Sequence, residues 1–396
     1  MHALNVAGIQ LGVACAGIRY PDRRDLVVIE AVAGTRAAAV FTQNAFCAAP
    51  VTVAQAHLAN AAPRYLVINT GNANAGTGAQ GLADAEATCR ALAEHTHCRP
   101  EEVLPFSTGV IGEPLPLERL IAGLPVALAA LHPESWLEAA HGIMTTDTRP
   151  KWASRRLLLA GREVNVTGIA KGAGMICPNM ATLLAFVATD AAADETLLQQ
   201  ILHEAVADSF NAITVDGDTS TNDALVLLAT GQSGATAPVE GEERIRFANA
   251  VREVCIELAQ AIIRDGEGAT KFITIQVEGG RDAAECRRTA YTIAHSPLVK
   301  TAFFASDPNW GRILAAVGRA ELAELDLERV AIYLDEIGIV RAGGRALDYT
   351  EAQGQQVMAR SDITIRVELG RGTATARIWT TDLSFDYVRI NAEYRT

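Results

Sequence analysis

Residues 168–190 read Gly-Ile-Ala-Lys-Gly-Ala-Gly-Met-Ile-Cys-Pro-Asn-Met-Ala-Thr-Leu-Leu-Ala-Phe-Val-Ala-Thr-Asp and join a glycine-rich segment to an apolar run. A short apolar run bounded by turn residues predicts a buried strand. Pro178 and Asn179 form a turn pair shortly before this run. Thr182 is therefore expected at the start of a core strand, just after a tight bend, with the small residue Ala181 before it.

A threonine in such a position can carry out chemistry on its own backbone. Its hydroxyl can attack the carbonyl in front of it and break that peptide bond, which would leave Thr182 as a new chain N-terminus. An α-amine has an ordinary pKa of about 7.7–8.0, low enough to act as the base for the threonine's own hydroxyl. The alternative is a plain loop that enters a strand, in which the threonine only satisfies local hydrogen bonds.

The segment from Lys171 to Thr182 resembles the self-cleavage signature of the ornithine acetyltransferase (glutamate N-acetyltransferase) family. The likeness extends over nearly the whole chain, through Gly8–Arg19, residues 41–51, Asn69–Gly81 and residues 305–313. It implies that the bond between Ala181 and Thr182 breaks autocatalytically. It also implies that Thr182 then carries an acetyl group.

The resemblance assigns roles to further residues. Thr108 and Gly109, in a Ser-Thr-Gly segment, would polarise the acyl carbonyl. A hydroxyl beside a backbone N–H is what an oxyanion hole needs, although Ser-Thr-Gly alone is also a common turn. The family likeness places five more residues against the substrate: Thr145, Lys171, Glu267, Asn391 and Thr396. Lys171 is expected to pair with a carboxylate and Glu267 with an ammonium group.

The implied reaction moves an acetyl group from N²-acetylornithine to glutamate in two steps, as part of arginine biosynthesis. No cofactor and no metal are expected, and acetyl-CoA stays open as a second donor. An N-terminal-nucleophile amidase or aminopeptidase remains an alternative, since it would differ only in using water to release the acyl group.

Two loops suggest other kinds of site. Gly76, Gly78 and Gly81 form a G-x-G-x-x-G pattern, which raises dinucleotide binding. In that fingerprint the first glycine follows the strand directly, whereas here an asparagine-rich loop intervenes. The acidic segment 216–223 suggests a calcium site but lacks the glycine and glutamate of an EF-hand loop, so we expect a polar loop near the active site.

Composition limits the classes of partner. The 396 residues carry 34 Lys and Arg against 46 Asp and Glu, a net charge of −12, which is unfavourable for binding nucleic acid. The seven cysteines contain no C-x-x-C pair, so disulfide scaffolds and zinc ribbons are not expected. No apolar run is long enough for a membrane span, and a cytoplasmic protein that acts on small molecules is expected.

The resemblance also implies the architecture. The expected fold class is α/β: a layered α/β sandwich of the self-processing aminopeptidase and ornithine acetyltransferase type, with a smaller C-terminal α/β lobe. Self-cleavage would give an α fragment, 1–181, and a β fragment, 182–396, in which about 182–280 completes the core domain and about 281–396 forms the lobe. The fragments would stay together because they share one core, and two copies of each would form an α2β2 assembly.

Overall fold

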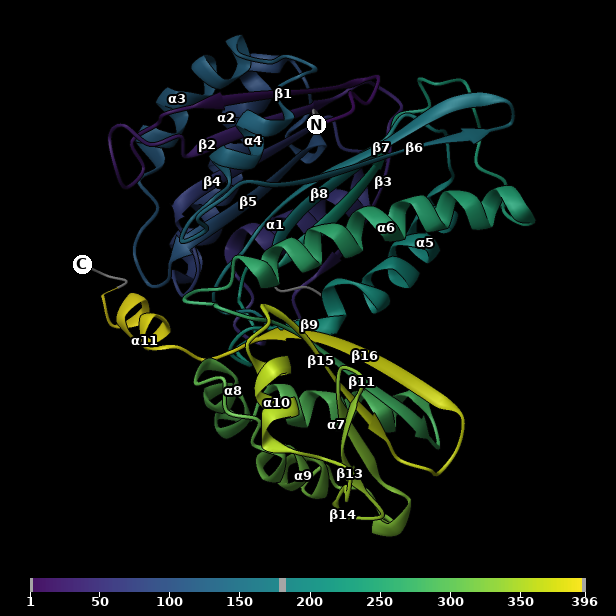
Figure 1. Ribbon diagram of the computed structural model, residues 1–396. Coiled ribbons are helices and arrows are strands. Elements are labelled where there is room, and N and C mark those ends of the chain that lie inside the picture. Colours follow the sequence, from purple (N-terminus) through teal and green to yellow (C-terminus); the bar gives the residue numbers. More distant parts are fainter. Residues whose placement is uncertain (1–2, 178–182, 394–396) are drawn as a thin grey trace. The chain divides into compact units, whose positions relative to one another are not determined.

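The computed structural model describes residues 3–177 and 183–393 (Figure 1). The chain divides into two compact units. The first comprises Met1–Asn211 and Asp218–Ile262, and the second comprises Ala212–Gly217 and Ile263–Thr396.

The first unit contains two sheets. The strands are β1 (Ile9–Ala14), β2 (Leu26–Ala31), β3 (Arg36–Phe41), β4 (Tyr65–Asn72), β5 (Val103–Val110), β6 (Lys151–Leu159), β7 (Arg162–Lys171), β8 (Leu184–Thr189) and β10 (Ala224–Ala229). One sheet has the order β1-β2-β4-β5 and the other β3-β10-β8-β7-β6. Strand β8 lies inside its sheet, parallel to β10 and antiparallel to β7.

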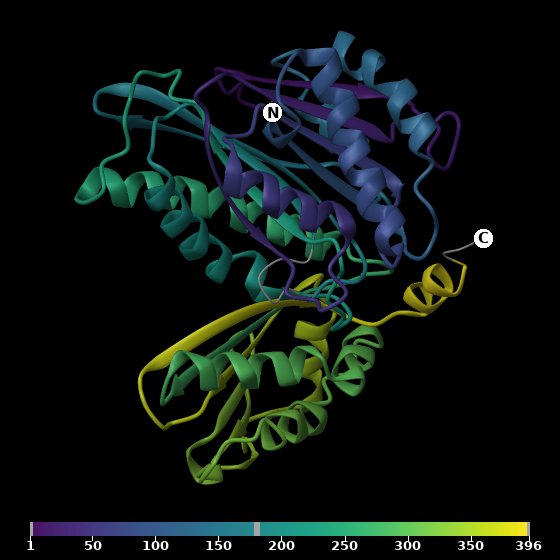
Figure 2. The same ribbon diagram turned by 180° about the vertical axis from the view of Figure 1, so that it is seen from behind.

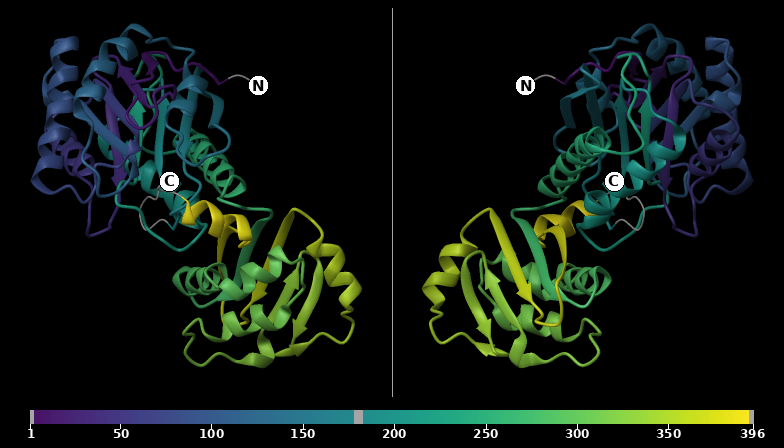
Figure 3. Two further views of the ribbon diagram at one scale, coloured as in Figure 1. Left: turned by 90° about the vertical axis from the view of Figure 1, so that its left-hand side faces the viewer. Right: turned by 90° about the vertical axis from the view of Figure 1, so that its right-hand side faces the viewer.

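The helices of this unit are α1 (Ala49–Asn60), α2 (Gly78–Thr96), α3 (Leu117–Ala129), α4 (Trp136–Gly142), α5 (Glu195–Asp208) and α6 (Glu242–Arg264). Helix α4 contacts strands of both sheets, and its Trp136, Ala139 and Ala140 belong to the apolar cluster between them. Helices α2 and α3 cover the four-stranded sheet, and α5 and α6 cover the five-stranded one, so that the two sheets lie between helical layers (Figures 2 and 3).

The core of the first unit lies between its two sheets. Alternate side chains of β2, β4 and β5 meet those of β8 and β10 in one apolar cluster, where Phe106 and Phe186 pack edge to face with ring centroids 5.1 Å apart. Every residue of β8 is buried, as its uninterrupted apolar run predicted. The polar ends of these strands are thereby held at fixed positions by packing.

The second unit is built on a seven-stranded sheet of order β14-β13-β12-β15-β11-β16-β9. Its strands are β9 (Ile213–Thr214), β11 (Phe272–Gly280), β12 (Ala331–Leu334), β13 (Ile337–Arg341), β14 (Gly344–Arg345), β15 (Asp362–Glu368) and β16 (Ala374–Thr381), and its helices are α7 (Ala283–Ala294), α8 (Pro297–Phe304), α9 (Trp310–Gly318), α10 (Glu351–Met358) and α11 (Phe385–Ala392). Helix α7 packs on β11 and β16. The expected α/β class, with a smaller C-terminal lobe, is confirmed.

Asp194 caps α5, since its carboxylate accepts a hydrogen bond from the Leu197 amide at 2.8 Å. All seven cysteines are free. No helix in the described part of the chain is long and apolar enough to cross a bilayer.

Candidate active site

Thr108 and Gly109 lie near the carboxyl end of β5, where this strand runs parallel to β4. Thr70 pairs with Thr108 and Gly71 with Gly109, after which a bulge shifts the register. Gly109 has a φ of +140°, and a Cβ atom there would lie 2.3 Å from the carbonyl carbon of Gly71. Only glycine fits at this close approach of two backbones. The backbone conformation at Thr108 and Gly109, the predicted oxyanion pair, is therefore fixed by its packing against Gly71.

Lys171 reaches this pair from the opposite sheet. It is the last residue of β7, whereas the sequence predicted it in a glycine-rich segment before the strand. Its side chain is buried, and its Nζ donates a hydrogen bond to the Thr108 Oγ1 at 3.1 Å. The face-to-face packing of the two sheets therefore brings together two predicted site residues that are 63 positions apart in sequence.

Asp147 is a residue of this site that the sequence analysis missed. Its buried carboxylate accepts hydrogen bonds from the amides of Thr145 and Gly172, at 2.9 and 2.7 Å, and from the Lys151 Nζ at 2.6 Å. Burial alone would raise the pKa of Asp147, but the ammonium groups of Lys151 and Lys171, with its hydrogen bonds, lower this pKa to about 2. Asp147 is thus ionised and fixes both Thr145 and the residue after Lys171. The signal in the sequence that could have identified Asp147 is its position two residues after Thr145, a predicted substrate contact.

The segment 219–223 is hydrogen-bonded to the backbone next to Thr108. The Asn222 side-chain amide donates to the carbonyl oxygens of Ala73 and Ser107, at 2.6 and 2.9 Å. Ser107 directly precedes Thr108 in the chain. Burial raises the pKa of the neighbouring Asp223 well above its ordinary value, although the Ser220 hydroxyl and Lys171 act to lower it. No cluster of three or more His, Cys, Asp or Glu residues suited to a metal occurs in the described residues.

Glu267 and Asn391 belong to the second unit, and the fold brings them together. The Asn391 Nδ2 donates to the Glu267 Oε2 at 2.7 Å. The turn that carries Glu267 is joined to the segment before α11, because the Asp382 carboxylate accepts hydrogen bonds from the amides of Thr270 and Lys271 at 2.8 and 2.9 Å. The two residues that the family likeness placed against the substrate thus share one hydrogen bond.

Three predicted residues, Ala181, Thr182 and Thr396, lie outside the described residues. The described chain on either side of the first two is well anchored. The Cys177 carbonyl accepts a hydrogen bond from the Thr219 hydroxyl at 2.9 Å, and the Leu183 carbonyl accepts one from the Ala224 amide at 2.9 Å. The two anchors, Thr219 and Ala224, lie on either side of Asn222 and Asp223 in the sequence.

The G-x-G-x-x-G loop is closed by its own side chains. The Asn74 side chain, which is fully buried, donates to the Gly81 carbonyl at 2.9 Å and accepts from the Thr77 hydroxyl at 2.9 Å. A Cβ atom at Gly81 would lie 1.9 Å from the Thr77 Oγ1. These glycines therefore serve a self-contained turn at the start of α2, which leaves the dinucleotide alternative without structural support.

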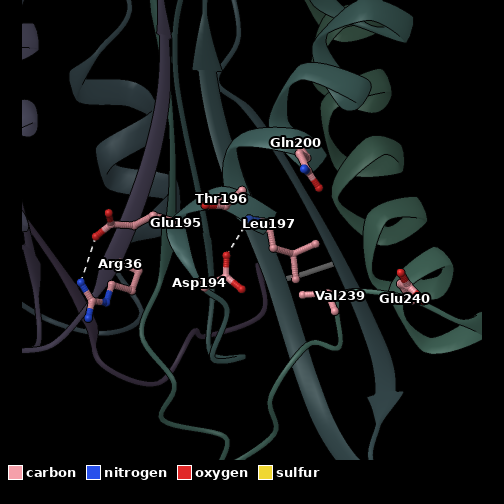
Figure 4. A pocket seen from close by; sticks show the side chains of 8 residues that line it. All are labelled: Arg36, Asp194, Glu195, Thr196, Leu197, Gln200, Val239 and Glu240. Carbon is pink, nitrogen blue, oxygen red and sulfur yellow. Dashed lines mark hydrogen bonds and ion pairs between the residues drawn. The ribbon is translucent and has the colours of Figure 1, made fainter.

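A surface pocket elsewhere in the first unit lies at the start of α5 (Figure 4). It is lined by Arg36, Asp194, Glu195, Thr196, Leu197, Gln200, Val239 and Glu240, and none of the described predicted site residues is among them. Arg36 and Glu195 pair with each other at 2.9 Å. This pocket is separate from the Lys171 surroundings and adds nothing to them.

Comparison with known proteins agrees with the geometry. A model of the ArgJ family matches residues 10–396. The arginine biosynthesis bifunctional protein ArgJ of Methylococcus capsulatus is 62% identical over 392 residues, which are 99% of this chain and 96% of that protein. The protein of the same name from Pseudomonas fluorescens is 56% identical over 393 residues, 99% and 97% of the two chains. The crystal structure of ArgJ from Bacillus halodurans has a TM-score of 0.51 and 39% identity, and the match covers 53% of this chain and 98% of the solved one.

Proposed function

This chain belongs to the ArgJ family, and from that premise we propose that it transfers the acetyl group of N²-acetylornithine to glutamate. The motif around Thr182 predicted this family, and with it an acyltransferase of arginine biosynthesis. The donor, the acceptor and an acetyl-Thr182 intermediate are the content of the proposal.

The observation that carries the proposal is the hydrogen bond between Lys171 and Thr108. A hydroxyl group has one donor and two acceptor positions. Because the Thr108 Oγ1 accepts from the Lys171 ammonium, its own O–H can donate to an oxyanion. The Gly109 amide would supply the second donor, and each such donor typically lowers the barrier by about 3 kcal/mol.

In the proposed first step, the Thr182 hydroxyl attacks the acetyl carbonyl while the Thr182 α-amine takes its proton. The tetrahedral oxyanion forms at Thr108 and Gly109, and ornithine leaves with a proton returned by the same amine. Glutamate then attacks the acetyl-threonine through its amine, and N-acetylglutamate leaves. Lys171 would hold a substrate carboxylate in both steps, and Glu267, positioned by Asn391, would hold the ammonium group of ornithine.

Self-cleavage before Thr182 supplies the α-amine that this mechanism requires. The solved Bacillus halodurans chain, which matches 53% of this chain over 98% of its own length, is about half as long as this one. The predicted fragment 182–396 contains 215 of the 396 residues, or 54%. A half-length solved relative therefore supports the cut.

The test is intact-mass analysis of the purified protein, followed by an acetyl-transfer assay. We expect two fragments, 1–181 and 182–396, and the second should gain one acetyl group when acetylornithine is supplied without glutamate. Thr182→Ala should give one uncut and inactive chain, whereas the matched Thr182→Ser variant keeps a hydroxyl and should still be cut. An unbroken but fully active wild-type chain would refute the proposal.

The product distinguishes this function from the amidase alternative. Transfer to glutamate predicts N-acetylglutamate, whereas release of free acetate at the same rate with or without glutamate would favour hydrolysis. The same assay with acetyl-CoA in place of acetylornithine tests the second donor. Native mass measurement tests the proposed α2β2 assembly, for which a single αβ pair would be the opposing result.

A further inference from the structure

The turn that carries Glu267 is held by a buried acid, Asp382, which follows β16 and is 3% exposed. Its Oδ1 accepts hydrogen bonds from the amides of Thr270 and Lys271, at 2.8 and 2.9 Å. Its Oδ2 accepts a third from the Thr270 hydroxyl, at 2.5 Å. Hydrogen bonds to a carboxylate are stronger than those between neutral groups, so Asp382 fixes the end of this turn firmly.

Ser384 binds the same turn closer to Glu267 and also begins α11. Its Oγ donates to the Gly268 carbonyl at 2.7 Å and accepts from the Tyr387 amide at 3.3 Å, as the N-cap of the helix. Gly268 has a φ of +68°, and a Cβ atom there would lie 2.5 Å from the Ser384 Oγ. The turn and the start of α11 are therefore in direct contact at the residue after Glu267.

The neighbours of Asp382 in the chain are anchored independently of this turn. Lys300, on α8, is 5% exposed, and its Nζ donates to the Thr381 carbonyl and, at 3.1 Å, to the Thr380 Oγ1. The Lys300 carbonyl accepts from the Leu383 amide at 3.3 Å. Residues on both sides of Asp382 are thus bonded to α8, and Asp382 is a fixed point to which the turn is attached.

We propose that Asp382 is a positioning residue for the ammonium group of acetylornithine, which acts through Glu267. It holds the turn so that the Glu267 carboxylate stays with the Asn391 amide, 2.7 Å away, in one ammonium site. This inference rests on the proposed function, in which Glu267 meets the side chain of ornithine. Because the side chain of glutamate carries no ammonium group, Asp382 should matter for the first half-reaction and not for the second.

The experiment measures kcat/KM for acetylornithine and for glutamate separately, since in a two-step route each value reports its own half-reaction. Asp382→Ala should lower kcat/KM for acetylornithine about tenfold, which corresponds to about 1.4 kcal/mol, and should change the value for glutamate by at most about twofold. Asp382→Asn keeps an acceptor oxygen for the two amides and should restore most of the lost kcat/KM. In a Glu267→Gln background, Asp382→Ala should cause no further loss, because it acts through Glu267.

Asp335 provides the matched control. It belongs to the same unit, in the turn between β12 and β13, and its carboxylate also accepts a backbone amide, that of Thr364, at 2.7 Å. Asp335→Ala should lower stability but leave both kcat/KM values unchanged. The control thereby separates a loss of folded protein from a loss of the ammonium site.

Unchanged kcat/KM for acetylornithine in Asp382→Ala, equal losses for both substrates, or a full further loss in the Glu267→Gln background would overturn the proposal while acetyl transfer itself stands. A wild type that forms no N-acetylglutamate would instead refute the proposed function. If Asp382→Ala folds poorly, Ser384→Ala, which removes the bond to Gly268, should lower the acetylornithine value alone by about threefold. No loss in that variant would count against the proposal.

Discussion

Replacing Asp147 by asparagine should destabilise the first unit more than any single surface change. The side chains of Asp147 and Lys151 are 0% and 1% exposed and are joined at 2.6 Å. Removing one partner of a buried ion pair leaves the other charge unpaired away from water, which costs about 3–5 kcal/mol. The carboxylate also accepts two backbone amides, from Thr145 and Gly172, so its loss loosens both segments of the site.

The assay is urea unfolding in the Thr182→Ala background, which should remain one chain. It compares the urea midpoints and slopes of the variants, because a chain of two compact units need not unfold in one two-state step. Glu195→Gln serves as the control, because Glu195 and Arg36 form an ion pair of 2.9 Å whose side chains are 60% and 57% exposed. This control should lose at most about 1 kcal/mol.

A double variant separates charge from shape. Asp147→Asn combined with Lys151→Met removes both charges, so it should recover more than half of the stability lost by Asp147→Asn alone. The reasoning is refuted if Asp147→Asn loses no more free energy of unfolding than Glu195→Gln, or if the double variant is less stable than the single one.

Three further predictions follow from the same geometry. Gly109→Ala should abolish transfer and lower the free energy of unfolding by about 2 kcal/mol or more, measured by urea, because its φ is +140° and the new Cβ would overlap Gly71; wild-type activity would contradict this. The folded pKa of Asp147 is lowered from 3.8 to about 2, so its ionised form stabilises the folded protein above about pH 4, and this stabilisation is lost as the pH falls through about 2. The loss amounts to about 2.5 kcal/mol, and acid unfolding of Asp147→Asn should not show it. Asn391→Ala should raise KM for acetylornithine about tenfold by releasing Glu267, with thermal stability nearly unchanged because Asn391 is exposed; an unchanged KM would exclude this role.

Much of the fold was predictable because its elements carry strong local signals. Strand β8 follows the predicted apolar run, and all of its residues are buried. The prediction was less accurate where tertiary contacts extend an element. Helix α2 already begins at Gly78, inside the glycine pattern, and the Asn74 side chain holds the loop before it by donating to the Gly81 carbonyl. Strand β7 continues to Lys171 because its second part, Val166–Lys171, pairs with β8 as far as Leu184.

The candidate site was predictable only where a motif marked it. Thr108, Gly109 and Lys171 were found by family likeness, and the structure brings the first and last into contact. Asp147 was missed as a site residue, since its role depends on burial and on partners that only the packing of two sheets brings near. The presence of an aspartate in the sequence does not indicate whether its side chain is exposed to water or lies beside a buried lysine.

The strand order of the five-stranded sheet has a consequence for how the two halves of the chain can be made. Strands β10 and β8 come from the predicted second fragment, and they lie between β3 on one side and β7 with β6 on the other, all three from the first. Each fragment alone would expose unpaired sheet edges. The cut would therefore have to follow folding, and we expect the two halves, synthesised from separate genes, to precipitate instead of reconstituting the enzyme.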